Sequence, residues 1–284
     1  MKRPVRKFGS GILAVLLLTS LALPAPSFAQ TSAPAPAPEL TLEQMKDFLK
    51  NARVIRTRST TKGITAPKRV TLSNGTVTHD AVFQAIDEHQ MVANLKGSRG
   101  ATTELNFVDS YKYNIAAYNI AGLLDLDHMM PVYVERRWNG QVGSISWFVE
   151  TMMDEGERLK KKVEPPNASD WNYQMYRMRV FASLARDTDR NVGNVLITPD
   201  WKVMMIDFTR AFRLQPELIY AKDLGKIDRK LLAKLEELSA DAVKKVTDDF
   251  LTKSEVEAVM KRRDLIVAHF KKLIAELGED KVLY

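Results

Sequence analysis

The spacing of apolar and polar residues changes from alternating to helical along the chain. A capping box, Thr41-Leu42-Glu43-Gln44, opens a short helix that we expect to end near Ala52. Beyond it, alternating apolar and polar positions predict strands over residues 53–59, 68–73 and 76–86. The last two strands are joined by Asn74-Gly75, a strong signal for a β-hairpin. This part of the chain therefore reads as a β-meander.

Helical spacing becomes common later in the sequence. Residues 109–126 are predicted to form an amphipathic helix, with Ile115, Tyr118, Leu123 and Leu124 near one face. Further elements are expected as strands over 132–137 and 143–149, and as helices over 170–185, 229–238, 241–250 and 254–277. Strands that come first and helices that follow predict an α+β fold with two lobes and a cleft between them.

Residues 1–29 have the pattern of a secretory signal peptide. A basic start, an apolar stretch over 11–23 and the site Ser27-Phe28-Ala29 predict export to the periplasm or the medium. An uncleaved membrane anchor is the alternative, but the apolar stretch is short for a span. Residues 30–40 read as an Ala/Pro-rich linker. No 20-residue apolar run follows, so we expect no transmembrane span after cleavage.

Composition narrows the function classes. The chain has 284 residues and no cysteine, so an exported form has no disulfides and depends on its own core. Four of its 42 basic residues lie in the signal, which leaves 38 against 35 acidic residues and indicates no nucleic-acid binding. The four histidines have no metal-ligand spacing, so zinc is not expected. We expect a monomer.

Three polar residues in one short region carry the candidate chemistry. Asp189 precedes Asn194 by five residues, and Asp207 follows after an apolar strand, the turn Thr198-Pro199-Asp200 and a second apolar strand. In kinase-type phosphoryl transfer, one carboxylate orients the attacking hydroxyl, while an amide oxygen and a second carboxylate hold Mg²⁺ against ATP. The spacing predicts Asp189 as the catalytic residue and Asn194 and Asp207 as metal ligands. The cofactors would be ATP and Mg²⁺.

The same region resembles the catalytic core of the atypical kinases, which include phosphoinositide kinases, HipA-like bacterial kinases and secretory-pathway kinases. Asp189-Arg190-Asn191 stands where phosphoinositide kinases carry Asp-Arg-His, and Ile206-Asp207-Phe208 stands where they carry Ile-Asp-Phe-Gly. The tail Thr209-Arg210-Ala211-Phe212-Arg213 resembles that of a group of exported bacterial proteins. The resemblance implies a two-lobed protein-kinase-like fold, with a small β-rich N-lobe over 41–150 and a mostly helical C-lobe over 151–284.

Two positions depart from the kinase pattern. A kinase small lobe supplies a strand lysine that grips the phosphates, paired with a helix glutamate. Here Gln84 and Asn114 stand at those positions. An amide–amide pair could keep the geometry, yet it lacks the cation that offsets phosphate charge. Four basic residues on other strands or loops could replace it: Lys62, Lys68, Arg69 and Lys96.

The expected nucleotide contacts come from four residues. Gln84 and Asn114 would contribute side chains, and the loop 60–67 would cover the phosphates with Thr61 and Gly63. A plain hairpin loop is an equally good interpretation of 60–67. Residues 146–150 would form the hinge that receives adenine, although Trp147 and Phe148 also suit an ordinary core.

Several charged residues near the motif have two interpretations. Asp187 is a rival base, but a loop hydrogen-bonding role suits it better. For Arg190 we expect a structural pairing with a nearby carboxylate. Arg210 and Arg213 could contact an anionic substrate or be ordinary surface groups. The basic run 158–162 reads as a solvated helix face.

Three classes of function remain. The first is an exported phosphotransferase that moves the γ-phosphoryl group of ATP to a hydroxyl on a protein, a lipid or a small molecule. The second is a pseudokinase that acts as a binding or scaffolding module of the cell envelope, which the uncharged Gln84 and Asn114 and the scarcity of ATP outside the cytoplasm favour. The third is a carbohydrate- or peptide-binding envelope protein unrelated to kinases.

Overall fold

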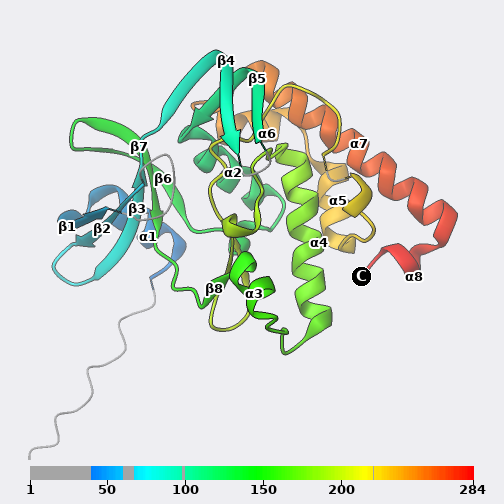
Figure 1. Cartoon of the computed structure of the whole chain (residues 1–284), viewed down its shortest axis with the longest axis horizontal. Helices are drawn as coiled ribbons and strands as arrows, with labels where there is room; N and C mark the ends of the chain where they lie inside the picture. The colour runs from blue at the N-terminus through cyan, green and yellow to red at the C-terminus, as the bar shows by residue number, and fades with distance from the viewer. Residues whose placement is uncertain (1–39, 60–66, 98–99, 220) are drawn as a thin grey trace, which may run out of the picture. The chain divides into compact units, whose positions relative to one another are not determined.

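The computed structural model describes residues 40–59, 67–97, 100–219 and 221–284. Contacts group residues 39–284 into one compact unit (Figure 1). The first elements are α1 (Leu42–Asn51), β1 (Arg53–Ser59), β2 (Lys68–Ser73), β3 (Thr78–Gln84), β4 (Asp87–Gly97), β5 (Gly100–Ser110), α2 (Lys112–Leu123), η1 (Asp127–Met129), β6 (Tyr133–Trp138) and β7 (Gln141–Trp147). The predicted signal peptide, most of the linker, Thr61, Lys62 and Gly63 lie outside the described residues.

The second half is mostly helical. Its elements are β8 (Met153–Asp154), α3 (Glu155–Lys161), α4 (Ala168–Ala185), η2 (Val192–Asn194), β9 (Val195–Ile197), β10 (Val203–Met205), η3 (Ala221–Asp223), α5 (Arg229–Glu237), α6 (Ala240–Thr247), α7 (Lys253–Leu277) and α8 (Glu279–Val282). The predicted α+β class, with strands first and helices afterwards, is confirmed. Among the described residues, no helix has both the length and the hydropathy to cross a membrane.

A five-stranded antiparallel sheet with the order β1-β2-β3-β7-β6 forms the main part of the first half. Because side chains alternate between the faces of a strand, β3 serves both sides of this sheet. Phe83 packs in one core cluster with Phe48 and Leu49 of α1. Val82 and Gln84 line a cavity instead. Strand β3 therefore joins the core of the sheet to the candidate site.

Helix α1 forms as its capping box predicts. Thr41 accepts the backbone N–H of Gln44, whose side chain accepts the N–H of Thr41 in return. At the other end, the Arg136 guanidinium donates to the carbonyls of Leu49 and Ala52 at 2.8 and 2.7 Å. Both ends of α1 are thus satisfied, and its apolar face stays on the sheet.

Helix α2 is shorter than predicted and is buried on more than one side. Residues 109 and 110 belong to β5, and the helix ends at Leu123 rather than 126. Its middle is almost wholly buried from Tyr113 to Ala121 apart from Asn119, because it contacts β6 and β7 as well as α6. The prediction of a one-sided amphipathic helix was therefore wrong.

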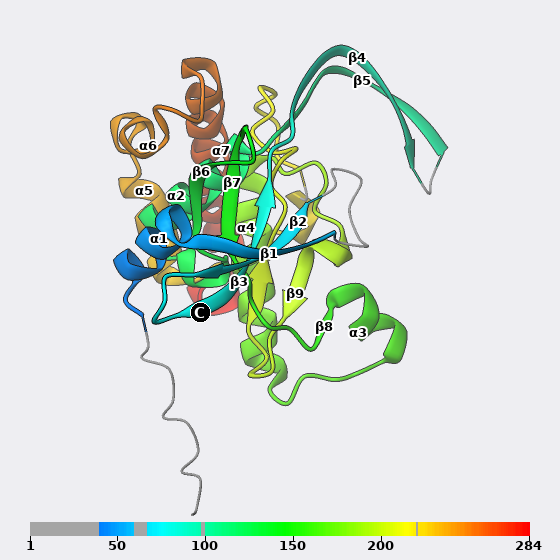
Figure 2. The ribbon, with the colours of Figure 1, turned by 90° about the vertical axis from the view of Figure 1, so that its left-hand side faces the viewer.

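The hairpin of β4 and β5 is the largest element that the sequence pattern did not predict. Its strands pair from Asp87↔Ser110 to Gly97↔Gly100. Figure 2 shows them running side by side away from the five-stranded sheet. Met91 and Val92 are adjacent and exposed, so the strand lacks the alternation of apolar and polar positions that marks a half-buried strand.

The predicted strand–turn–strand unit that precedes Asp207 is present. Strands β9 and β10 pair antiparallel, and β8 adds a third strand through Met153↔Ile197. Thr198 closes the turn, because its hydroxyl accepts the N–H of Lys202 at 2.9 Å. All three residues of β10 are buried, which fixes the point where Asp207 leaves the strand.

Candidate functional site

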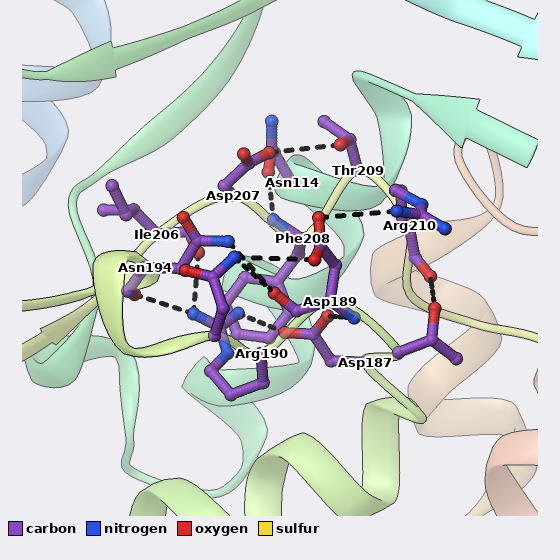
Figure 3. A network of polar contacts seen from close by, with 12 residues as sticks. Asn114, Asp187, Asp189, Arg190, Asn194, Ile206, Asp207, Phe208, Thr209 and Arg210 are labelled. Atoms are coloured by element: carbon purple, nitrogen blue, oxygen red, sulfur yellow. Dashed lines mark hydrogen bonds and ion pairs between the residues drawn. The ribbon is translucent and has the colours of Figure 1, made fainter. Parts of the chain in front are cut away.

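The loop after α4 is held by one arginine. Helix α4 ends at Arg186 in a left-handed conformation, and Asp187 follows with no exposed surface. Arg190 forms an ion pair with Asp187 and donates to the carbonyls of Asn194 and Ile206 at 2.8 and 2.7 Å (Figure 3). Its guanidinium also lies 4.2 Å from the centre of the Phe208 ring. The structural role expected for Arg190 is what the geometry shows.

Asp187 and Asp189 have different surroundings. Asp187 accepts the N–H of Asp189 at 3.1 Å and is enclosed with Arg190. The Asp189 side chain is 42% exposed, and its carboxylate lies 3.6 Å from Arg210. Its backbone carbonyl accepts the side-chain amide of Asn194 at 3.1 Å. Of the two candidate bases, only Asp189 offers its carboxylate to an incoming molecule.

The carboxyl of Asp207 is largely enclosed, although the residue keeps some exposed surface, and its backbone conformation is unusual. Its φ of 57° lies in the left-handed region, where Asp is tolerated better than most residues. Burial raises the pKa of Asp207, and the nearby Asp189 raises it further. A hydrogen bond from the Thr209 hydroxyl at 3.1 Å and the charge of Arg190 act in the opposite direction. A buried carboxylate of this kind gains from a bound cation.

Gln84 and Asn114 form a direct amide pair. The Asn114 Oδ1 accepts the backbone N–H of Phe208 at 2.8 Å, so its Nδ2 is the donor to Gln84 Oε1 at 2.9 Å. Gln84 in turn hydrogen-bonds to Asp207, which requires its Nε2 as the donor. The network thus fixes the orientation of both amides. It links α2, β3 and the Asp207-Phe208 segment without a charged side chain on α2 or β3.

A cavity of about 270 Å³ brings the candidate residues together. Gln84, Asn194 and Asp207 all line it. Its remaining wall is largely apolar and comes from Pro67, Val82, Pro131, Tyr133, Trp147, Phe148, Val149, Leu196 and Ile206, together with Ser146, Asp154 and Gly193. An apolar cavity with a few convergent polar groups is the usual form of a small-molecule site.

The structure brings five predicted residues into one region and leaves two outside the described part. Hydrogen bonds join Asp189 to Asn194, and Gln84 to both Asn114 and Asp207. Arg190 links the two groups, because it donates to the carbonyls of Asn194 and Ile206. Thr61 and Gly63 lie outside the described residues. Of the expected hinge, 146–150, residues 146–149 line the cavity and Glu150 does not.

The replacement cation is not found among the described candidates. Lys68 pairs in register with Phe83, so it lies on the far face of the sheet, 5.7 Å from the Trp138 ring. Arg69 lies on the cavity face, but it binds Asp80 at 2.6 Å and stacks on the Phe148 ring at 3.6 Å. Lys62 and the side chain of Lys96 lie outside the described part. Among the described residues that line the cavity, Gln84 and Asn194 bring amide groups to the end that holds Asp207, and no lysine lines this cavity.

Two residues near Asp207 were missed by the sequence interpretation. Thr209 donates to Asp207, and Asp109 hydrogen-bonds to the same hydroxyl. Burial raises the pKa of Asp109. Because the hydroxyl proton of Thr209 is already given to Asp207, a protonated Asp109 can donate to its oxygen. Asp109 was assigned to the start of a helix, and its position at the root of an unpredicted hairpin gave no signal for this role.

The donor set fits magnesium held together with a nucleotide. No group of three or more His, Cys, Asp or Glu side chains that could hold a metal occurs in the described part of the chain. Asn194 and Asp207 offer one amide and one carboxylate in a shared cavity. Mg²⁺ is commonly held by one or two protein oxygens while phosphates and water complete its shell.

Comparisons with known proteins bear on the fold of the chain. No family model matches the sequence, and no curated protein matches it. Among solved structures, hydra Fam20 with sugar superposes with a TM-score of 0.61 at 13% identity, covering 86% of this chain and 92% of that one. The chain has an atypical kinase-like fold.

Two further structures have the same fold. The Golgi casein kinase matches with a TM-score of 0.57 at 12% identity, over 85% of this chain and 78% of that one. The proinflammatory kinase CtkA of Helicobacter pylori matches with a TM-score of 0.50 at 12% identity, over 81% of this chain and 98% of that one. The resemblance to atypical kinases expected from the sequence is confirmed for the fold.

Proposed function

We propose that this chain is an exported kinase-like phosphotransferase that moves the γ-phosphoryl group of ATP to an acceptor hydroxyl. The observation that carries the proposal is the convergence of Asp189, Asn194 and Asp207 at one loop braced by Arg190. Asn194 and Asp207 line one cavity. Residues of β3, β6 and β7, the strands that would hold the nucleotide, line the same cavity. The kinase-like fold of the neighbouring structures supports the same reaction class.

Asp189 accepts the proton of the acceptor hydroxyl in this proposal. Its exposed carboxylate is held near Arg210, and its backbone is held by Asn194. The hydroxyl oxygen then attacks the γ-phosphorus while the bond to the β-phosphate oxygen breaks. Arg190 keeps the loop in register by binding the carbonyls on both sides of the β9–β10 hairpin.

Asn194 and Asp207 would hold Mg²⁺, which when bound supplies positive charge to the nucleotide phosphates. Gln84 positions the Asp207 carboxylate, and Asn114 positions Gln84. Tyr133, Trp147 and Phe148, which line the cavity, would form the apolar wall against which the base lies. Export through the signal-like residues 1–29 is part of this proposal. The acceptor is proposed only as a hydroxyl group.

A pseudokinase is the second candidate, and one observation favours it. The pair that carries charge in kinases is here the uncharged Gln84–Asn114 hydrogen bond. Without a lysine at the position of Gln84, the phosphates lack part of the charge that binds them in kinases. In this case the fold would serve as a binding or scaffolding module in the envelope.

Titration calorimetry with a non-hydrolysable ATP analogue tests the nucleotide site directly. We expect binding that needs Mg²⁺ and is lost in Asn194→Ala and in Asp207→Ala. Asp200→Ala is the matched control, because Asp200 is an exposed residue of the neighbouring turn whose partner Lys202 is also exposed. Absence of binding in the folded wild type would contradict the phosphotransferase and favour the pseudokinase.

A further inference from the structure

A second cavity, of about 500 Å³, lies behind the catalytic loop. It is lined by α3, by α4 and by loop residues Arg190, Asn191 and Val192. No residue lines both this cavity and the one that contains Asp207. The second cavity therefore forms a separate potential site, which we call the rear cavity.

The wall of the rear cavity is built by close packing of α3 on the loop. Asp154 caps α3 by accepting the N–H of Glu157 at 2.8 Å. A Cβ atom at Gly156 would lie 3.1 Å from a methyl group of Val192, so the glycine lets α3 pack closely on this side chain. Helix α3 contacts η2, which belongs to the catalytic loop. This contact holds the α3 side of the cavity in place against the loop.

The α4 side of the rear cavity offers an apolar wall. Trp171, Met175 and Met178 of α4 line the cavity, and each of these residues is less than 10% exposed. Leu159 and Val192, which also line it, are 53% and 48% exposed. An apolar wall with exposed apolar side chains beside it suits the apolar part of a ligand.

The three arginines of this cavity differ in their partners, and Arg190 is already engaged by Asp187 and two carbonyls. Arg158 is fully engaged, because it binds both Glu155 oxygens at 2.6 and 2.9 Å and the carbonyl of Val163 at 2.8 Å. Arg179 has a ring contact with Tyr176 at 5.8 Å, and within the described residues it has no ion pair or hydrogen bond. Its charge is therefore available to a ligand. Of the two acidic residues that line the cavity, Glu155 is paired with Arg158, and Asp223 is exposed and screened by water.

We propose that the rear cavity binds an amphipathic organic anion. The aromatic or aliphatic part of the ligand lies against Trp171, Met175 and Met178. Its carboxylate, sulfonate or phosphate group pairs with Arg179. A charge-assisted contact at the edge of an apolar cavity gives both affinity and orientation.

Asn191 connects the rear cavity to Asp189. Its Nδ2 lies 3.2 Å from the Asp189 carbonyl and 3.4 Å from the Asp189 carboxylate, and its Oδ1 accepts the N–H of Gly193 at 2.8 Å. A ligand that contacts Asn191 therefore influences the position of Asp189. This consequence rests on the proposed phosphotransferase, whereas binding itself does not.

The test uses the dye 1-anilinonaphthalene-8-sulfonate, which joins an aromatic body to one anionic group. Titration of the purified protein, without nucleotide or Mg²⁺, should give saturable fluorescence with one site per chain. Decanoate should displace the dye, and uncharged decanol at the same concentration should displace it far less. Because no phosphoryl transfer is measured, failure here is independent of failure of the proposed function.

Two variants localise the dye. Arg179→Gln should weaken binding roughly tenfold, the usual effect of losing one charge-assisted contact. Met175→Trp should abolish binding by filling the cavity. The control Arg137→Gln removes an exposed charge on β6 and should leave binding unchanged. Circular dichroism and melting curves verify the fold, and Arg179→Gln serves alone if Met175→Trp fails to fold.

Three outcomes would overturn the proposal. One is an absence of saturable dye binding by the folded wild type. Another is equal binding by wild type and Arg179→Gln. The third is displacement by the ATP analogue with no effect of either variant, which would place the dye in the cavity of Asp207.

Discussion

The Asn114 side chain receives the backbone N–H of Phe208 at 2.8 Å, and so a buried residue of α2 holds the chain one position past Asp207. The same amide donates to Gln84 at 2.9 Å. In a kinase with the lysine–glutamate pair, the corresponding link is ionic. Here it consists of neutral hydrogen bonds, whose strength depends on having a donor and an acceptor in the right places.

Asn114→Asp should therefore disrupt the hydrogen bonds of the site, although it only replaces the side-chain nitrogen by an oxygen. The new side chain loses the donor to Gln84 and places a carboxylate in a buried position. A buried polar group left unpaired costs about 1–3 kcal/mol, and more if it is charged. Urea unfolding measures the loss, and nucleotide titration should show weaker binding.

Asn119→Asp is the control for that change. Asn119 lies on the same helix and donates to the Val246 carbonyl at 2.8 Å, away from Gln84 and Asp207. It should lose stability without a specific effect on nucleotide binding. Equal effects of the two variants on nucleotide affinity would contradict the role given to Asn114.

Arg190→Met should be among the most destabilising single changes in the chain. It leaves the fully buried Asp187 without its cation and two backbone carbonyls without a donor. Removing one partner of a buried ion pair costs about 3–5 kcal/mol. Denaturant unfolding should show that the double variant Arg190→Met/Asp187→Leu recovers part of the loss.

The comparison for Arg190 is Lys112→Met, which breaks a partly exposed pair with Asp87 at 3.6 Å. Such pairs are worth about 0–1 kcal/mol. If Arg190→Met is no more costly than Lys112→Met, the loop does not depend on Arg190 as described.

Gly143 and Gly122 give a matched pair of alanine substitutions. A Cβ atom at Gly143 would lie 2.4 Å from the Gln84 carbonyl, so β7 and β3 would have to separate beside the site. At Gly122, on α2, nothing lies within 4 Å. Gly143→Ala should lower the melting temperature, whereas Gly122→Ala should raise stability by roughly 0.5–1 kcal/mol. Calorimetric melting of both proteins checks the contrast.

Asp109 should make the protein less stable as pH rises. Burial raises its pKa above the ordinary value of 3.8, so between these two values the native state binds a proton that the unfolded state has released. Stability is then lost as pH rises through this window, and Asp109→Asn should remove the loss. Melting curves from pH 3 to pH 7 should show the variant gaining on the wild type as pH increases.

Asp200 provides the opposite sign. Hydrogen bonds from Lys202 and Thr198 lower its pKa, so its contribution is present above 3.8 and disappears as pH falls. Asp200→Asn should therefore lower the stability slightly near neutral pH, and this difference from the wild type should disappear in acid.

For Asp109, a pH profile of Asp109→Asn parallel to that of the wild type would contradict the burial argument.

The sequence predicted those parts of the site that are close together along the chain. Asp189, Asn194 and Asp207 flank one strand–turn–strand unit, β9 to β10, and this unit was predicted from local signals. The Gln84–Asn114 pair was expected only through resemblance, because the two residues are 30 positions apart and meet through sheet topology.

Other features could not be predicted from local patterns. Few of the described side chains of the β4–β5 hairpin are buried, and no alternation of apolar and polar positions marked its strands. The shared Thr209 hydroxyl depends on this hairpin, because β5 ends with Asp109 and Ser110 beside the chain that follows Asp207. Likewise, the rear cavity depends on how α3 packs against η2, which only tertiary structure determines.

The β4–β5 hairpin is attached mainly at its root. The Ser110 N–H bonds to the Thr209 carbonyl at 2.8 Å, while Met91, farther along β4, is 84% exposed. An isolated two-stranded ladder is only marginally stable in water. In hydrogen–deuterium exchange, amides near Met91 should therefore exchange through local opening, while that of Ser110 should be protected much longer. A ligand that tightens the segment after Asp207 would slow exchange at Ser110 first, so this amide can report on the site without a substrate being known.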